Sequence, residues 1–142
     1  MATSPQALIL AAFLDRLAAL TLSPPLLTAL PGIPFPPGDT KPENYLIAEM
    51  IFNATRQITL GPDAQQKRGI FQVTVVWQAN VGLVKPLDVA GAIIAHFNNQ
   101  TLFASGVRIT ISSEPWAASP IQDADRISIP VSIPWHAFEP ES

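Results

Sequence analysis

The stretch that decides the fold is Gly69-Ile70-Phe71-Gln72-Val73-Thr74-Val75-Val76-Trp77. Its odd-numbered residues from Phe71 onward are apolar, whereas Gln72 and Thr74 between them are polar. An alternation with a period of two residues places the two sets of side chains on opposite faces of a β-strand. We therefore predict a strand over Gly69–Trp77 with its odd-numbered face in the core.

Three other stretches predict strands of the same sheet. Tyr45–Phe52 is rich in apolar and aromatic residues, with Glu49 as its one interior charge. Val107–Ser112 alternates apolar and polar residues, which is typical of a half-buried strand. In Ile127–Trp135 every odd-numbered residue is apolar, so one face of this last strand is expected to be buried.

Two prolines in the last strand lead to a prediction about its place in the sheet. Pro130 and Pro134 have the same parity, so their missing N–H donors lie along one edge of the strand. The other edge keeps all its donors. We predict that Ile127–Trp135 lies at the margin of the sheet with its proline side unpaired, and that the amide of Ser132 on this side exchanges quickly.

Two segments have the spacing of amphipathic helices. Ser4 and Pro5 are a helix-start signal, and the apolar stripe that follows predicts a helix over Pro5–Leu20. A second helix is expected to begin at Val84-Lys85-Pro86, to carry Asp88 in its first turn, and to end at Asn98 and Asn99. Its expected buried face consists of Leu87, Ala90, Ile93, Ile94 and Phe97.

The order of the elements is helix, strand, strand, helix, strand, strand. The chain between Trp77 and Val107 has room for a crossover helix, which would allow those two strands to be parallel. We predict an α+β fold, namely a mixed, mostly antiparallel four-stranded sheet with two helices packed on one face. The whole chain, 1–142, is expected to be a single domain with its α/β core over 44–135. The residues expected to lie buried together are Phe71, Val73, Val75, Ile93, Ile94, Phe97, Ile109, Ile129 and Val131.

Three segments are predicted to be irregular. Ser23–Pro42 contains seven prolines, whose fixed φ angles and missing donors exclude a regular element, so we expect a stiff arm on the domain. Gln57–Arg68 and Glu114–Asp125 are polar loops longer than a hairpin needs, and such loops are commonly functional or mobile.

The composition favours a folded, soluble chain and excludes several classes of function. Hydrophobic residues make up 48% of the chain and charged residues 13%, so a core can form. The net charge of −3 is too balanced to indicate nucleic acid or an acidic membrane as the main partner. The absence of cysteine excludes disulfides and thiolate chemistry. No apolar run approaches the ~20 residues of a membrane span.

No group of residues predicts catalysis, a cofactor or a metal site. His96 and His136 lack metal-ligand spacing, and we interpret them as solvated or edge residues. Asp123 and Asp125, with Glu114 upstream, could gather around calcium, but the EF-hand pattern is missing, so a solvated acidic loop is the preferred interpretation. Phosphate-binding glycine motifs and the GxSxG motif are also missing.

A further signal is the order and spacing of five segments, Tyr45–Met50, Arg68–Val75, Asp88–Asn98, Gly106–Ile109 and Ile129–Trp135. This arrangement resembles the tail terminators, the tail-completion family of minor tail proteins in long-tailed phages. The proline-rich Ser23–Pro42 departs from the family pattern.

The resemblance implies a structural virion protein without catalytic residues. Proteins similar to this one form a ring, usually hexameric, that caps the tail tube, ends its polymerisation and offers the head-joining surface. The implied partners are other copies of the chain, tail-tube proteins and head-connector proteins, with no sequence-specific nucleic acid and no membrane. The implied location is the virion tail, after assembly in the host bacterial cytoplasm. The candidate assembly contacts are Gln57, Arg68, Glu114, Trp116, Asp123 and Asp125.

The residues alone leave two alternatives open. One is a non-enzymatic adaptor module that binds another protein through the proline-rich arm. The other is a small enzyme that uses Asp123, Asp125 or His136, which would show a pocket around those side chains.

Exposed apolar candidates are few, with Trp116 and Phe138 among them, so we expect isolated copies to be monomeric or weakly associated.

Overall fold

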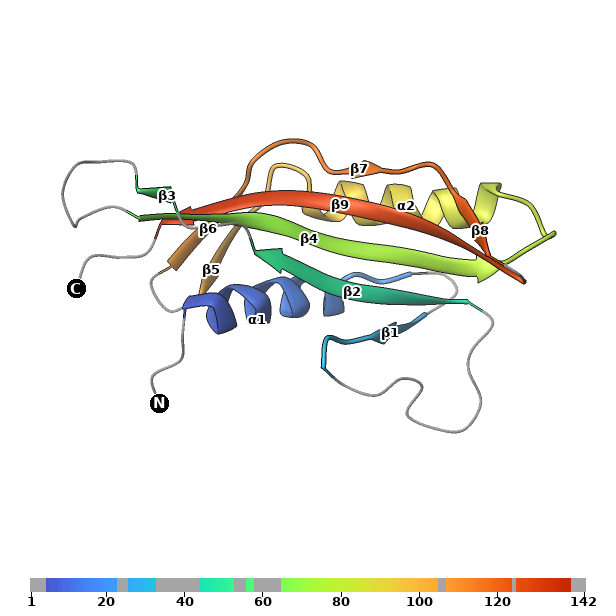
Figure 1. The fold of residues 1–142 in the computed structure, drawn as a ribbon, viewed down its shortest axis with the longest axis horizontal. Helices are drawn as coiled ribbons and strands as arrows, with labels where there is room; N and C mark the ends of the chain where they lie inside the picture. The colour runs from blue at the N-terminus through green and yellow to red at the C-terminus, as the bar shows by residue number, and fades with distance from the viewer. Residues whose placement is uncertain are drawn as a thin grey trace.

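The longest strand, β4 (Gln65–Gln78), lies in the middle of the sheet and contains the predicted strand Gly69–Trp77. The structure is a computed structural model and describes residues 5–22, 26–32, 44–52, 56–57, 65–104, 107–123 and 125–138. Figure 1 shows β4 beside the last strand, β9 (Arg126–Phe138), along the length of the molecule. These two strands form the centre of the sheet.

Two helices and seven shorter strands complete the described part of the chain. The helices are α1 (Pro5–Ala18) and α2 (Val84–Phe97). The strands are β1 (Leu27–Ala29), β2 (Tyr45–Phe52), β3 (Arg56–Gln57), β5 (Thr101–Ala104), β6 (Val107–Ile111), β7 (Trp116–Ala117) and β8 (Ile121–Asp123). Neither of the described helices is long and apolar enough to cross a membrane.

The described strands form one nine-stranded sheet in the order β1-β2-β4-β9-β6-β5, with β3 beside β4 and with β7 and β8 beside β9. β1 and β2 are parallel, and the other described pairs are antiparallel. The predicted α+β class with a mixed, mostly antiparallel sheet is confirmed. The predicted number of four strands is wrong. The four expected strands are present, but five strands of two to four residues pair with them, and such short strands give no periodic signal in the sequence.

The crossover between β4 and β6 does not produce a parallel pair. β9 lies between these strands and is antiparallel to both. β4 and β6 therefore run in the same direction without being neighbours. The parallel pairing is not formed because the last strand of the chain inserts between them.

β9 is a central strand, so the prediction that it lies at the margin of the sheet is wrong. The carbonyl oxygen of Pro130 accepts a hydrogen bond from the amide of Ala118 at 2.8 Å, and that of Pro134 accepts one from Ser112 at 2.9 Å. The prolines therefore do face one side, as their parity predicts, but β6, β7 and β8 cover that side in turn. Proline lacks a donor but keeps its acceptor, which is enough for short, interrupted strands. Because β7 pairs with Ser132, the prediction of fast exchange for this amide also loses its basis.

Segments predicted to be irregular contain strands. β1 lies within Ser23–Pro42, where no proline occurs between Pro25 and Pro31 and backbone donors are available for pairing with β2. Both ends of the predicted loop Gln57–Arg68 belong to strands, namely β3 and β4. β7 and β8 lie within the predicted loop Glu114–Asp125. Residues 23–25, 33–42, 58–64 and 124 of these segments lie outside the described residues.

Both helices pack on the face formed by the odd-numbered residues of β4 and β9. The ring of Phe13 in α1 lies 4.9 Å from that of Phe71 in β4 and 6.0 Å from that of Phe97 in α2. Trp135 of β9 joins this aromatic cluster, with its ring 6.0 Å from that of Phe13. The predicted core residues that are fully buried are Phe71, Val73, Val75, Ile93, Phe97, Ile109, Ile129 and Val131.

Three details of α2 differ from the prediction. Leu87 is 44% exposed, because the buried stripe runs through Pro86 and Val89 instead. Ile94 is only partly buried against the core. The first turn of α2 carries no acidic residue, since the helix begins at Val84 and Asp88 lies just beyond that turn. The predicted end is confirmed, with Asn98 as the C-cap. Helix α1 ends at Ala18, slightly before the expected Leu20.

Candidate assembly surfaces

One face of the sheet is covered by neither of the described helices. It is formed by the even-numbered residues of β4 and β9, opposite the core face, and of these Thr74 and Val76 are nevertheless buried. One row of register partners crosses it from Glu49 through Gln72 and Ser132 to Trp116. The exposed apolar side chains on this face include Ile51, Trp116 and Ile121. The solvated face of an antiparallel sheet is commonly polar, so apolar side chains here indicate a protein-binding surface.

Arg68 and Gln57 belong to the same end of the two long strands. Gln57 is part of β3, which pairs with the start of β4. Arg68 is exposed on the uncovered face, in register with His136 of β9. Arg108 of β6 is exposed on the same face and is in register with Phe138, two residues along β9 from His136. The fold thus collects cationic residues that are dispersed along the sequence.

Asp123 and Asp125 lie at the opposite end of β9. Asp123 ends β8 and is in register with Arg126. The carboxylate of Asp125 forms an ion pair of 2.9 Å with the guanidinium of Arg126, and its side chain is 82% exposed, so the pair contributes little to stability. Glu114 and Trp116 lie between the two ends, both exposed. The six candidate contacts therefore do not form one site but occupy three places along β9.

His96 is fixed between the two helices, so its interpretation as a solvated or edge residue is wrong. Its Nε2–H donates to the carbonyl oxygen of Arg16 at 2.7 Å. In return, the guanidinium of Arg16 donates to the carbonyl oxygen of His96 at 2.7 and 3.2 Å. These reciprocal hydrogen bonds join the C-terminal ends of α1 and α2. His136 is partly exposed, and its Nδ1 lies 2.8 Å from the hydroxyl of Ser112.

The residues considered for catalysis do not meet. Asp125 lies just before β9 and His136 near its end, and a strand rises about 3.3 Å per residue, so about 35 Å separates them. This separation excludes a site that combines the two. Among the described residues, no three His, Asp or Glu side chains lie close enough together to hold a metal ion.

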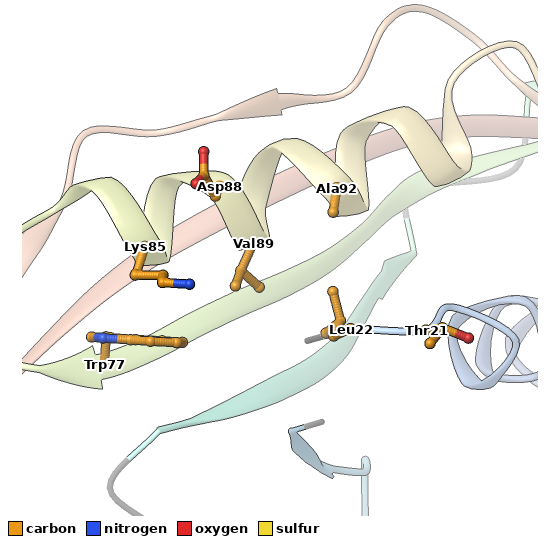
Figure 2. Close-up of a pocket in the computed structure, with 7 residues that line it drawn as sticks. All are labelled: Thr21, Leu22, Trp77, Lys85, Asp88, Val89 and Ala92. Atoms are coloured by element: carbon orange, nitrogen blue, oxygen red, sulfur yellow. The ribbon is translucent and has the colours of Figure 1, made fainter. Parts of the chain in front are cut away.

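A small cavity lies between α2 and the end of β4, away from the residues considered for catalysis (Figure 2). Its volume is about 170 Å³, and its lining consists of Thr21, Leu22, Trp77, Lys85, Asp88, Val89 and Ala92. In Figure 2, Trp77 of β4 lies opposite Val89 and Ala92 of α2. Ligand pockets usually measure about 300–1,000 Å³, so this cavity suits a single side chain better than a small-molecule substrate.

Exposed apolar residues are more numerous than the sequence indicates. The large ones among the described residues are Leu27, Leu30, Ile51, Phe52, Val81, Leu83, Val84, Leu87, Phe103, Trp116 and Ile121. Trp116 is confirmed as exposed, whereas the side chain of Phe138 lies outside the description. Sequence patterns miss Phe103 because β5 is too short to show an alternation. They misplace Leu87 because helical spacing does not fix how a helix is rotated on a sheet.

Comparison with known proteins gives both a family match and a shared fold. The family model described as "Phage tail terminator protein" matches residues 8–135. One solved protein structure has 29% sequence identity and a TM-score of 0.79, covering 98% of this chain and 100% of its own. A chain from the virion of a native gene transfer agent particle has 15% identity and a TM-score of 0.70, covering 97% of this chain and 100% of its own, and thus shares the fold. No curated protein matches the chain.

Proposed function

The chain belongs to the phage tail terminator family, and from this we propose that it caps the tail tube as a ring, ends the polymerisation of the tube and offers the surface that joins the head. The observation that carries the proposal is the family match over residues 8–135, which includes most of α1, all of α2 and the sheet as far as Trp135. Membership makes the chain a structural component of the phage tail and not an enzyme.

Apolar patches on different parts of the subunit support self-assembly. The uncovered sheet face carries Trp116 and Ile121, whereas Val81 and Val84 lie at the turn before α2 and at its start. Two different patches on one chain allow each copy to contact the next head to tail, and such contacts close into a ring when their rotation permits. The resemblance to ring-forming tail terminators makes six the expected number of copies.

The exposed apolar residues also bear on the strength of association. The expectation of weak self-association rests on a scarcity of exposed apolar side chains, and that premise is wrong for the described residues. Aromatic and other apolar side chains are enriched in the buried cores of interfaces. A concentration series in solution therefore decides whether the ring forms alone or only on the tube.

The proposal is tested by assembling purified tail-tube protein with and without this chain. If the chain is a terminator, tubes grown in its presence should be shorter and should carry additional density at one end in electron micrographs. Light scattering across a concentration series should show when free copies assemble. Heads should attach only to tubes that carry the cap. Failure to bind tube ends, together with no assembly at any concentration, would contradict the proposal.

The alternative of an adaptor module depends on the proline-rich arm. Within that arm, Leu27–Ala29 pairs with β2. A polyproline ligand needs an extended segment without backbone pairing, so these three residues cannot serve as part of such a ligand. A tight partner that binds a monomer of this chain, and that is lost when residues 33–42 are replaced, would favour the adaptor function over the tail function.

A further inference from the structure

We propose that neighbouring copies in the ring are joined by Phe103 of one copy, which enters the cavity beside α2 of the next copy, while Arg108 of the first copy pairs with Asp88 of the second. The inference rests on the proposed ring and specifies one contact within it.

Phe103 is an aromatic side chain that its own fold leaves in solvent. It is 73% exposed, whereas its neighbour Leu102 packs against the core from the other face of β5. Burial of a phenyl ring is favourable, and aromatic side chains in fitted pockets are common anchors of protein interfaces. β5 is also the last strand on its side of the described sheet, so a second subunit can approach it.

The cavity has the size and the lining that a phenyl ring requires. Its volume of about 170 Å³ is close to the ~150 Å³ of an apolar protein cavity that binds benzene. Leu22, Trp77, Val89 and Ala92 supply apolar atoms around it, and Figure 2 shows Lys85 extending above the ring of Trp77 at one side. A phenyl group would therefore be held by dispersion contacts, without a polar partner of its own.

When the phenyl ring of Phe103 enters the cavity, Arg108 of the same copy lies next to Asp88 of the neighbouring copy, and their opposite charges attract. Phe103 and Arg108 are register partners on neighbouring strands, so their Cβ atoms lie about 5 Å apart on the same face. Asp88 and Ala92 are four residues apart on α2, a spacing of about 6 Å. Within the described residues, neither Arg108 nor Asp88 has an ion-pair partner. The Cβ spacing of Phe103 and Arg108 on one copy thus matches the Cβ spacing of Ala92 and Asp88, both of which line the cavity, on the next.

The two halves of this contact lie on different parts of the subunit. Figure 1 shows β5 towards one end of the molecule and the first turns of α2 towards the other. Phe103 therefore cannot fill the cavity of its own chain. A contact between two different surfaces is head to tail, which is the type that builds rings.

The first experiment changes the phenyl ring of Phe103 and the cavity separately. Phe103→Ala removes the phenyl group, and Ala92→Leu fills the cavity. Each should raise the midpoint concentration of assembly in sedimentation velocity at least tenfold, the effect typical of an interface anchor. The matched controls are Leu27→Ala, an exposed apolar side chain on β1 at the other edge of the described sheet, and Ala95→Leu, an exposed position of α2 outside the cavity. Both controls should stay within about threefold of the wild type. Circular dichroism establishes that each variant is folded.

The second experiment tests the pairing of charges and the proximity of the two sites. Arg108→Asp and Asp88→Arg should each weaken assembly, and the double variant should recover part of the loss. Because the chain contains no cysteine, mixed Phe103→Cys and Ala92→Cys subunits should form an intermolecular disulfide under mild oxidation. Leu27→Cys subunits mixed with Ala92→Cys subunits should not form one.

The outcomes separate this inference from the proposed function. If the wild type assembles while both Phe103→Ala and Ala92→Leu assemble equally well and no disulfide forms, the contact is overturned and the ring stands. If the wild type remains monomeric at all concentrations and on tube ends, the ring and its contact are both overturned.

Discussion

The indole ring of Trp135 lies directly against Gly69, its register partner on β4. A Cβ atom at position 69 would lie 2.9 Å from Cζ2 of Trp135 and closer still to the carbonyl oxygen of Ile51. The indole cannot move away freely, because its Nε1–H donates to the sulfur of Met50 at 3.2 Å and its ring packs on that of Phe52 in a T-shaped arrangement with ring centroids 6.0 Å apart. Glycine is therefore required at position 69 for space.

Gly69→Ala should lower the free energy of unfolding by about 1–3 kcal/mol, the usual penalty for overpacking a core. Chemical denaturation followed by tryptophan fluorescence measures the change. Gly91→Ala is the control, since a Cβ at this exposed helical position meets no atom within 4 Å. The control should be neutral or stabilising by about 0.5–1 kcal/mol. Equal stability of Gly69→Ala and the wild type would show that Trp135 does not hold its position.

Phe97→Ala should destabilise the fold by about 3–5 kcal/mol, because it leaves a cavity between α2 and the rings of Phe13 and Phe71. Such a loss is a large part of the stability of a typical domain. Phe103→Ala is the matched control: the same atoms are removed from a side chain that is 73% exposed, so the change should stay within about 0.5 kcal/mol. Thermal or denaturant unfolding compares the two. A loss below about 1 kcal/mol for Phe97→Ala would contradict its place in the core.

Arg16→Lys should weaken the junction between the two helices. Lysine keeps the charge but cannot reproduce the two guanidinium hydrogen bonds to the carbonyl oxygen of His96. We expect a loss of about 1–2 kcal/mol in unfolding free energy, because both bonds are only partly buried. Arg108→Lys, at an exposed position, is the control and should change stability little. Equal effects of the two variants would indicate that the Arg16–His96 bonds do not contribute.

The amides of Val131 and Ser132 should differ in hydrogen exchange. By parity with Pro130, Ser132 faces β7, a strand of two residues, whereas Val131 faces the long β4 ladder. Short strands open locally more readily, so the amide of Val131 should be protected at least tenfold more than that of Ser132. Exchange followed by NMR measures both rates. Exchange of Ser132 at the rate of an unstructured amide would show that β7 does not pair with β9.

The sequence predicts individual elements well where the pattern is long. The alternations in Gly69–Trp77 and Ile127–Trp135 identify both central strands and their buried faces, and helical spacing identifies α1 and α2. The candidate site is predicted less well. Of its six residues, Arg68, Glu114, Trp116 and Asp125 are exposed, but they lie at separate places along β9. Phe103 and the cavity beside α2 have no signal in the sequence, because the cavity is formed by residues far apart in the chain.

What the sequence by itself determined is the set of helices and long strands and the face that each buries, since these depend on the local spacing of apolar side chains. Only the tertiary structure decided which strands are neighbours. Nothing local distinguishes an edge strand with prolines from β9, whose proline side is covered by β6, β7 and β8. Strand pairing is a long-range choice among several partners with similar apolar faces, and the carbonyl groups of Pro130 and Pro134 remain able to accept hydrogen bonds. The same long-range packing brings Arg68, Arg108 and His136 to one end of the uncovered face.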